Sequence, residues 1–242
     1  MKRRVDIIVP VLNEPENFRA FYDFISRHTQ SDWRLYMVYN VEKDPTLEQA
    51  KPIADRDSRV HLIFSPQPGA LNAVKTGIKN VECEAVLTAM VDDPQTVLAK
   101  IDTLVEQFYA EQATIVVASR YMRGGSHTGG PFIKGVLSRL AGVSLHFIVG
   151  LPTHDATYAT RLYRKSFLER TPIESQRGFE LAMELTLKAF FAGEKIIETP
   201  VEWQERTVGT SRFELRKWLP AYLHWYVWAL KRRYSPFVLK KS

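Results

Sequence analysis

The sequence predicts an α/β protein with a mostly parallel central sheet flanked by helices. Short apolar runs rich in β-branched residues alternate with segments of helical period, which is typical of strands joined by crossover helices. Hydrophobic residues make up 45% of the 242 positions and charged residues 25%, enough apolar side chains for a sizeable core. Ligands of such a sheet bind beyond the carboxyl ends of the strands, so we expect the functional residues there.

The first half of the chain repeats strand and helix in order. Residues 5–11 predict a buried strand because they are short, β-branched and closed by Pro10 and the loop residues 13–15. Further strands are predicted at 33–40, 60–64, 85–91 and 114–118, and helices at 18–25, 45–54, 70–78 and 97–108.

The second half has a different texture. A Gly-rich loop at 123–130 precedes a predicted helix at 133–147 and a mixed segment at 154–163. A helix at 179–191, stopped by Gly193, and a strand at 195–201 follow. From residue 215 onward the chain is aromatic and basic.

The charge and cysteine content limit the partners and the compartment. A formal net charge of +6 favours an anionic partner, such as a nucleic acid, a nucleotide or a membrane surface. Cys83 is the only cysteine, so no intrachain disulfide can form, and a reducing compartment fits. The apolar run at 5–12 contains Asp6 and is too short for a signal peptide, and the run at 218–230 is too short to span a bilayer.

Asp92 and Asp93 follow the predicted strand 85–91 and are themselves followed by Pro94 and Gln95. Their hard oxygen ligands suit Mg²⁺ or Mn²⁺ bound to a diphosphate at the end of the strand. The alternative is that the pair caps the next helix beside solvent.

Several short phrases occur in an order that resembles glycosyltransferase family 2, and within it the dolichol-phosphate mannose synthase branch. The resemblance covers residues 5–212. The phrases lie at 10–14, 69–73, 92–95, 118–125, 138–139, 154–157, 178–184, 198–201 and 205–212.

This resemblance implies a GT-A fold and inverting transfer of a sugar from a GDP or UDP sugar to a polyprenyl phosphate, with Mg²⁺ or Mn²⁺ as cofactor. It implies a catalytic domain at 1–212, with the nucleotide bound by residues 1–120 and the acceptor by 121–212, and a helical tail at 213–242. A phosphate acceptor is already ionised, so the site would act mainly by positioning and charge stabilisation.

The resemblance also assigns residues to roles. Donor binding falls to Pro10, Asn13, Glu14, Asn40, Asn72, Asp92, Arg206 and Arg212. The acceptor phosphate falls to Arg120, Lys134 and Arg139. The metal falls to Asp93, Gln95 and Asp92, and the catalytic set is Asp93, Asp155, Arg120 and Arg206.

The chain departs from the family pattern at two places. Val91 stands where the first metal-binding acid belongs, so Asp92 must substitute for that acid or one ligand is missing. Tyr39 and Asn40 occupy the place of two acids that read the base and ribose. Asn40 can still form hydrogen bonds and Tyr39 can stack on a base, but the nucleobase stays undetermined.

Two other functions remain open. The same fold would transfer to a saccharide or another soluble hydroxyl if Asp155, Glu180 or Glu184 acted as a general base. A protein that binds nucleotide or lipid phosphate without turnover would also explain the altered acids. Nucleic-acid binding is not expected, because no reader motif accompanies the scattered cations.

The tail combines interfacial aromatic residues with cations. The aromatics are Trp218, Tyr222, Trp225, Tyr226 and Trp228, and the cations are Lys231, Arg232, Arg233, Lys240 and Lys241. One interpretation is a helix that lies on the cytoplasmic face of the membrane and makes the protein peripheral there. The other is a helix whose aromatics pack against the catalytic domain or a partner chain.

Overall fold

The computed structural model describes residues 3–130, 132–204 and 215–235, without the side chains of 132, 134 and 215–217. The strands are β1 (Arg4–Pro10), β2 (Asp32–Tyr39), β3 (Val60–Phe64), β4 (Ala85–Thr88), β5 (Ile115–Ser119), β6 (Ser126–Thr128), β7 (Arg161–Arg164), β8 (Ile196–Pro200) and β9 (Glu202–Gln204). The helices are α1 (Pro15–His28), α2 (Thr46–Ala54), α3 (Ala70–Asn80), α4 (Gln95–Leu98), α5 (Ile101–Ala110), α6 (Phe132–Val149), α7 (Lys165–Arg170), α8 (Leu181–Phe191) and α9 (Leu215–Tyr234).

Seven strands form one sheet in the order β3-β2-β1-β4-β7-β5-β8. All neighbours are parallel except β7, which runs antiparallel to both β4 and β5. Two short strands, β6 and β9, pair in parallel outside this sheet. The predicted α/β class with a mostly parallel sheet is therefore confirmed.

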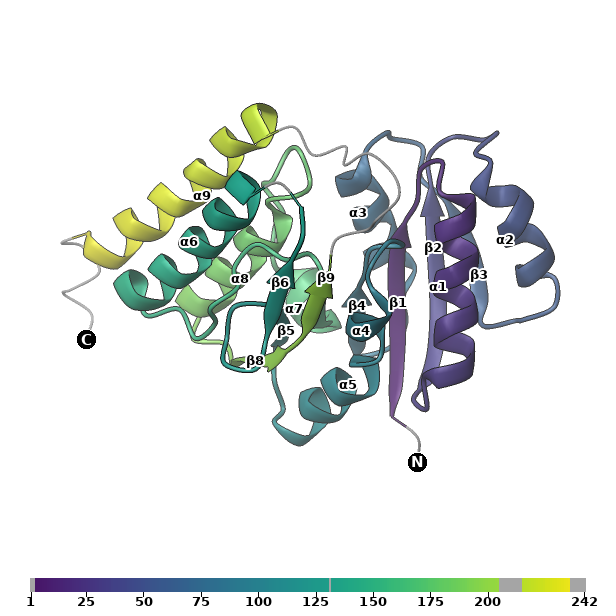
Figure 1. Cartoon of the computed structure of the whole chain (residues 1–242), viewed down its shortest axis with the longest axis horizontal. Coiled ribbons are helices and arrows are strands. Elements are labelled where there is room, and N and C mark those ends of the chain that lie inside the picture. Colours follow the sequence, from purple (N-terminus) through teal and green to yellow (C-terminus); the bar gives the residue numbers. More distant parts are fainter. Residues whose placement is uncertain (1–2, 131, 205–214, 236–242) are drawn as a thin grey trace.

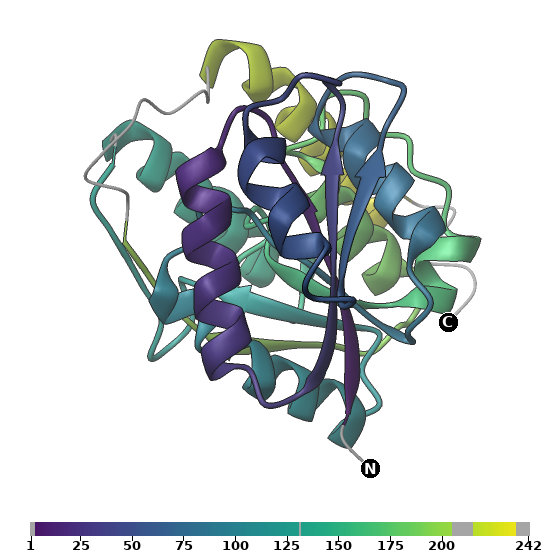
Figure 2. The ribbon, with the colours of Figure 1, turned by 90° about the vertical axis from the view of Figure 1, so that its right-hand side faces the viewer.

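Helices cover both faces of the sheet (Figure 1). On one face, alternate residues of β1 pack with α1, α2, α4 and α5 in the largest apolar cluster. On the other face, Ile8 and its neighbours pack with α3, α7 and α8. Figure 2 shows the N-terminal strands between α1 and α2 on one side and α3 on the other. Residues 5–10 of β1 are all buried, and because successive side chains of a strand point to opposite faces, this single strand serves two cores.

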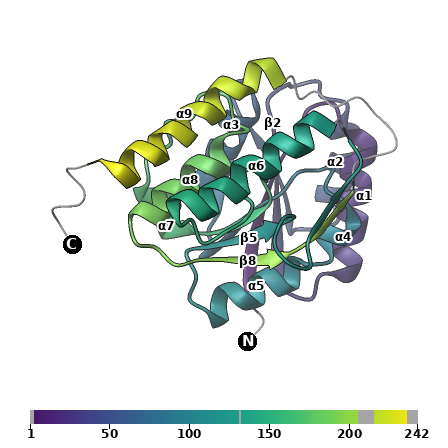
Figure 3. The ribbon, with the colours of Figure 1, turned by 60° about the vertical axis from the view of Figure 1, so that its left-hand side comes forward.

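A third apolar cluster joins α6, α8 and α9 outside the sheet layers (Figure 3). Trp225 is only 3% exposed in it, and the hydroxyl of Tyr222 donates to the carbonyl of Phe179 at 2.8 Å. Tyr226 and Trp228 pack against the same cluster. Of the two interpretations of the tail aromatics, packing against the rest of the chain is the observed one for these four side chains. Among the described residues, no helix has the length and apolarity needed to cross a membrane.

Apart from shifts of a few residues at the ends of elements, the structure departs from the prediction in the following ways. The strand predicted at 85–91 ends at Thr88, because Asp93 and Met90 hydrogen-bond to each other and turn the chain. The helix predicted at 97–108 is two helices, α4 and α5, separated by Ala99 and Lys100. The Gly-rich loop contains a strand, β6, that its composition does not indicate.

Gly142 allows α6 to approach the segment that carries Asp155, since a Cβ at this position would overlap the carbonyl oxygen of His154. We expect Gly142→Ala to lower the free energy of unfolding by about 1–3 kcal/mol, because helix and loop must separate. Urea unfolding followed by circular dichroism measures this. The matched control is Gly135→Ala in the same helix, where the nearest atoms belong to the His127 ring and can move. Equal stability of the two variants would contradict the close approach.

Candidate active site

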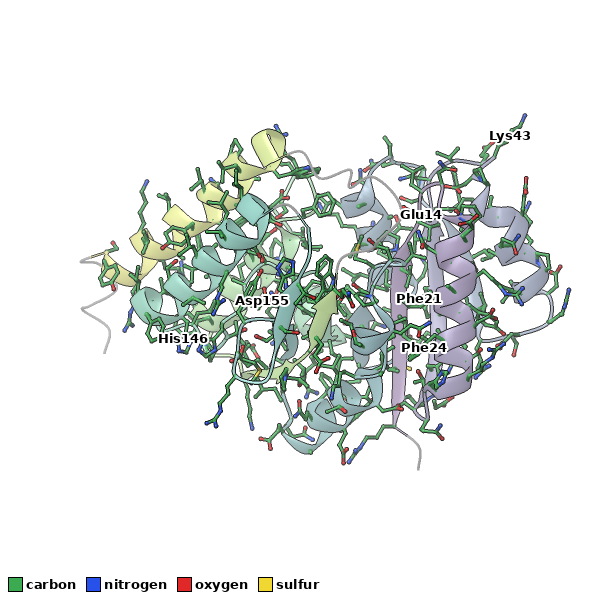
Figure 4. All side chains as sticks on the ribbon, in the orientation of Figure 1. Glu14, Phe21, Phe24, Lys43, His146 and Asp155 are labelled. Carbon is green, nitrogen blue, oxygen red and sulfur yellow. The ribbon has the colours of Figure 1, made fainter. Side chains whose placement is uncertain are left out.

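The antiparallel direction of β7 assembles the candidate site. The parallel strands β1, β2, β4 and β5 end at one edge of the sheet, and β7 begins at that edge. The segment 153–160, which precedes β7, is therefore brought next to the turn after β4 and the end of β5. In Figure 4, Glu14 lies at the N-terminal end of α1 and Asp155 among the elements of the second half.

Arg120 and Asp155 form a buried ion pair at the carboxyl end of β5. Nε of Arg120 donates to Oδ2 of Asp155 at 2.7 Å, and Nη2 donates to Oδ1 at 3.0 Å. Nη2 also donates to the hydroxyls of Ser138 on α6 and Thr157, both at 3.1 Å. One guanidinium thus connects β5, α6 and the segment before β7, with the two-pronged geometry that arginine provides.

Asp155 remains ionised despite complete burial. Burial opposes its ionisation, but the charge and hydrogen bonds of Arg120 outweigh burial and hold the pKa of Asp155 below its ordinary value. The backbone N–H groups of Thr157 and Tyr158 donate to it as well. Its carboxylate lies behind Arg120, so its influence on a ligand passes through the position of that side chain.

Asp93 is also buried, and its carboxylate is engaged within the protein. Oδ1 accepts the hydroxyl of Tyr158 at 2.6 Å, while Oδ2 accepts the hydroxyl of Thr160 at 2.5 Å and the N–H of Met90 at 2.9 Å. Burial, together with the neighbouring charge of Asp92, raises the pKa of Asp93 to about 6. Asp93 therefore anchors the turn after β4 to the segment before β7.

The turn after β4 provides oxygen donors suited to a hard cation. Asp92 is half-buried and Gln95, the first residue of α4, is exposed. A carboxylate has about four acceptor positions, so the three hydrogen bonds to Asp93 leave one on Oδ1. Asp92, Gln95 and that position fit Mg²⁺ or Mn²⁺ if a diphosphate and water complete the shell. Among the described residues, no three His, Cys, Asp or Glu side chains gather as a metal site, so the protein alone does not form a full cage.

The loop after β1 is held rigidly by two buried residues of the next β–α connection. The N–H of Asn13 donates to both oxygens of Asp44 at 3.0 and 3.1 Å, and the N–H of Glu14 donates to the hydroxyl of Thr46 at 2.9 Å. Asn13 adopts a φ of 56°, a left-handed conformation that asparagine tolerates better than most residues. Asn13 is exposed, three residues beyond the buried Pro10.

Aromatic side chains stand at the ends of β2 and β3, and the family pattern has acids at the first of these two places, after β2. The rings of Tyr39 and Phe64 lie 5.5 Å apart, and Phe64 is 42% exposed. Asn40 follows as a half-buried residue. Asn72 lies in the first turn of α3, where its amide donates to the carbonyl of Pro68 at 2.8 Å. The expected donor-binding residues thus come from β1, β2 and α3 along one edge.

A cavity of about 590 Å³ lies on the other side of Arg120. Arg120, Arg139 and Val136 line it, together with the Gly-rich loop. Nη1 of Arg120 makes no hydrogen bond with the part of the chain that is described, so it can still donate to a ligand there. Arg139 is exposed on α6. The side chain of Lys134 and the whole of Arg206 and Arg212 lie outside the described residues.

Glu180 and Glu184 are buried and bind backbone rather than facing a cavity or solvent. The carboxylate of Glu180 accepts the N–H groups of Gln176, Arg177 and Gly178 at 2.8–3.1 Å. Glu184 accepts two more, from residues 174 and 175, and a bond from Lys188. The carboxylates of these two acids, four residues apart, thus hold the loop before α8 in place through their hydrogen bonds.

Four residues contribute to the site without having been singled out from the sequence. They are Ser138, Tyr158, Thr160 and Arg161. Arg161 is fully buried and donates to the carbonyls of Tyr158 and Asp155, and burial lowers its pKa. The guanidinium of Arg120 lies 4.6 Å from the centre of the Tyr158 ring. Ser138 lies within the 138–139 phrase and Tyr158 follows the 154–157 phrase, so the matched phrases were the one available signal for these residues.

Comparison with known proteins agrees with this geometry. The protein-family model described as Glycosyl transferase family 2 matches residues 6–171. A polyprenol monophosphomannose synthase of Mycolicibacterium smegmatis is 27% identical over 87% of this chain and 81% of its own length. An undecaprenyl-phosphate mannosyltransferase of Micrococcus luteus is 23% identical over 86% of this chain and 87% of its own.

A dolichol-phosphate mannosyltransferase of Pyrococcus furiosus is 23% identical over 87% of this chain, and this chain spans only 59% of its length. Among solved structures, glucosyl-3-phosphoglycerate synthase from Mycobacterium tuberculosis, in complex with Mn²⁺, UDP and glucosyl-3-phosphoglycerate, has a TM-score of 0.69. It is 16% identical, and the match covers 96% of this chain and 80% of that one. At this identity the likeness shows the fold alone.

The raised pKa of Asp93 makes stability depend on pH. A carboxyl whose pKa rises from 3.8 to about 6 on folding destabilises the folded state as pH increases between these values. Asp93→Asn keeps an acceptor for Met90 and Thr160 and removes the charge. We expect its stability relative to the parent protein to increase by up to about 3 kcal/mol from pH 4 to pH 7. Urea unfolding in EDTA at several pH values measures this, and a difference that is independent of pH would contradict a buried, ionising Asp93.

Proposed function

Because the chain belongs to glycosyltransferase family 2, we propose that it transfers a sugar, with inversion, from a nucleoside-diphosphate sugar to a polyprenyl phosphate. Relatives named for polyprenol, dolichol-phosphate and undecaprenyl-phosphate substrates support this choice of acceptor. Its GT-A fold is shared with transferases solved with UDP and Mn²⁺ or Mg²⁺. The nucleotide is GDP or UDP, because the aromatic residues Tyr39 and Phe64 do not select between the two bases.

The acceptor assignment depends on the burial and hydrogen bonding of the three carboxylates considered as general bases. Asp155, Glu180 and Glu184 are each at most 1% exposed, and each is bound by several N–H groups or a cation. None of them is placed to take a proton from an incoming hydroxyl, as a saccharide acceptor would require. An ionised phosphate needs no such proton transfer.

In the proposed reaction an oxygen of the acceptor phosphate attacks the anomeric carbon. The bond from that carbon to the diphosphate oxygen breaks, and the nucleoside diphosphate leaves from the opposite face. Nη1 of Arg120 and the guanidinium of Arg139 orient the attacking phosphate, while Asp155, Ser138 and Thr157 hold Arg120 in place. Arg206 and Lys134 are proposed to add positive charge, at the donor and acceptor sides respectively.

On the donor side, Pro10, Asn13, Glu14, Asn40 and Asn72 are proposed to bind the nucleotide, with Arg212 near its phosphates. A divalent cation held by Asp92, Gln95 and Asp93 would neutralise charge on the leaving diphosphate. Asp93 also keeps the turn after β4 in register with Tyr158. The proposal includes a peripheral position at the cytoplasmic face of the membrane, where a polyprenyl phosphate would be reached, and a division into a catalytic domain at 1–212 and a tail at 213–242.

Transfer to lipid phosphate is tested with labelled GDP and UDP sugars, Mn²⁺ and two acceptors, a short-chain polyprenyl phosphate and the corresponding alcohol. We expect label on the phosphate only. Arg139→Ala should raise KM for the phosphate acceptor about tenfold and leave KM for the donor unchanged, because the exposed guanidinium binds the acceptor alone. Labelling of a saccharide or the alcohol, with none on the phosphate, would favour the hydroxyl-acceptor alternative.

A metal-dependent transferase is distinguished from a simple binding protein by the effect of metal on nucleotide affinity. UDP and GDP are titrated calorimetrically with Mn²⁺ or with EDTA. We expect Mn²⁺ to tighten binding of at least one nucleotide, and Asp92→Asn to weaken the Mn²⁺-dependent part about tenfold, because a charged oxygen ligand is replaced by a neutral one. Glu106→Gln, at an exposed acid of α5, is the matched control. Nucleotide binding that ignores both the metal and Asp92 would support a binding protein without turnover.

A further inference from the structure

Three exposed apolar side chains lie at the carboxyl ends of β1, β2 and β3. Leu12 is 42% exposed, Val41 44% and Phe64 42%. They are the large hydrophobic residues that the described part of the chain exposes outside α6 and α9. Because the three strands are parallel neighbours in the sheet, their ends lie along one edge (Figure 1). Asn13 and Asn40, which are proposed to bind the nucleotide, belong to the same edge.

Phe64 presents an aromatic ring that is supported from behind. It pairs with Tyr39 across β3 and β2, and the two rings lie 5.5 Å apart with 57° between their planes. Tyr39 in turn packs against the largest apolar cluster. The next residue, Ser65, is fully buried; its N–H donates to the carbonyl of Tyr39 at 2.7 Å, and its hydroxyl accepts that of Thr76 on α3 at 3.0 Å. The backbone that carries the ring is therefore fixed before a ligand binds, which lowers the entropic cost of binding.

Of the three acids in the loops after β1 and β2, two are engaged within the protein. Both oxygens of Asp44 accept the N–H of Asn13, and one of them also accepts the hydroxyl of Thr46 at 2.6 Å. Glu14 accepts the side-chain amide of an asparagine in α1. The third acid, Glu42, is exposed. Neither of the first two offers a whole carboxylate to a base.

The half-buried amide of Asn40 follows Tyr39 at the end of β2. An amide carries an acceptor oxygen beside a donor NH₂ group. Adenine, guanine, cytosine and uracil each have an adjacent donor and acceptor on the Watson–Crick edge, so an amide can pair with any of them. A carboxylate has acceptors only and favours guanine, whose edge has two adjacent N–H donors.

We propose that the donor site binds the nucleobase by stacking on Phe64, with Asn40 at the edge of the base, and accepts nucleoside diphosphates of any base. Stacking tolerates this variety because every base has a π-face. Discrimination among nucleotide sugars then falls to the sugar and not to the base. This inference rests on the proposed function, since it concerns the donor nucleotide, and it extends the donors from guanine and uracil nucleotides to those of adenine and cytosine.

Calorimetric titration of UDP, GDP, ADP and CDP with Mn²⁺ tests the inference, because these ligands share ribose and diphosphate and differ only in the base. We expect the four dissociation constants to agree within about tenfold. Phe64→Ser should weaken all four about tenfold, through loss of the stacked ring. Asn40→Asp should raise the preference for GDP over ADP about fivefold, because a carboxylate accepts both N–H groups of guanine and repels the ring nitrogen acceptor of adenine.

The controls separate stacking from other effects. Phe64→Trp keeps an aromatic face and should bind all four nucleotides as the parent protein does. Leu140→Ser removes an exposed apolar side chain from α6, away from this edge, and should change none of the four constants. Unchanged circular dichroism and melting temperature show that each variant is folded.

Three results would overturn the inference and leave the proposed function standing. The first is a preference for one base of well over about tenfold; its loss in Glu42→Gln would show that a carboxylate reads the base. The second is unchanged affinity of Phe64→Ser for all four nucleotides, and the third is an unchanged ratio of GDP to ADP affinity in Asn40→Asp. Binding of none of the four with Mn²⁺ would contradict the proposed function itself.

Discussion

The buried ion pair between Arg120 and Asp155 is the constraint on which the arrangement of the site depends. Charges removed from water are tolerated only when they are paired and hydrogen-bonded. Here the pairing requires the end of β5, the segment before β7 and the Ser138 hydroxyl of α6 to be in register together. Arg161 adds a second buried cation that binds the backbone of the same segment. The second half of the chain is therefore organised around polar groups that the apolar core alone would not position.

This organisation determines what kind of chemistry the site can perform. Its buried acids are committed to structure: Asp155 to a guanidinium, Glu180 and Glu184 to backbone N–H groups, and Asp93 to two hydroxyls and one N–H. The groups with capacity left for a ligand are cations and the half-exposed donors of the turn after β4. Such a site stabilises anions and orients them, which suits a reaction between two phosphorylated substrates.

Hydrophobic periodicity predicted the parallel strands of the first half and hence the edge where Asn13 and Asp92 lie, and the family resemblance pointed to Arg120. Hydrophobic periodicity could not predict β7, because this strand has four residues and begins with a buried arginine, so it lacks the apolar pattern of a strand. The partner of Asp93, Tyr158, is 65 positions away, and no local signal connects them. The tail aromatics were ambiguous because an interfacial helix and a packed one use the same side chains. Only the position of α8 and α6 decides which way Trp225 faces.

The Tyr158 ring touches both halves of the site, with its hydroxyl on Asp93 and its face near Arg120. A substitution at Asp93 or Arg120 therefore removes a contact of Tyr158, and a substitution of Tyr158 removes a contact of both. Loss of the phenol would remove one hydrogen-bond donor to Asp93, on the proposed donor side, and one neighbour of the Arg120 guanidinium, on the proposed acceptor side. A substitution of Tyr158 would therefore disturb the proposed donor side through Asp93 and the proposed acceptor side through Arg120 at the same time.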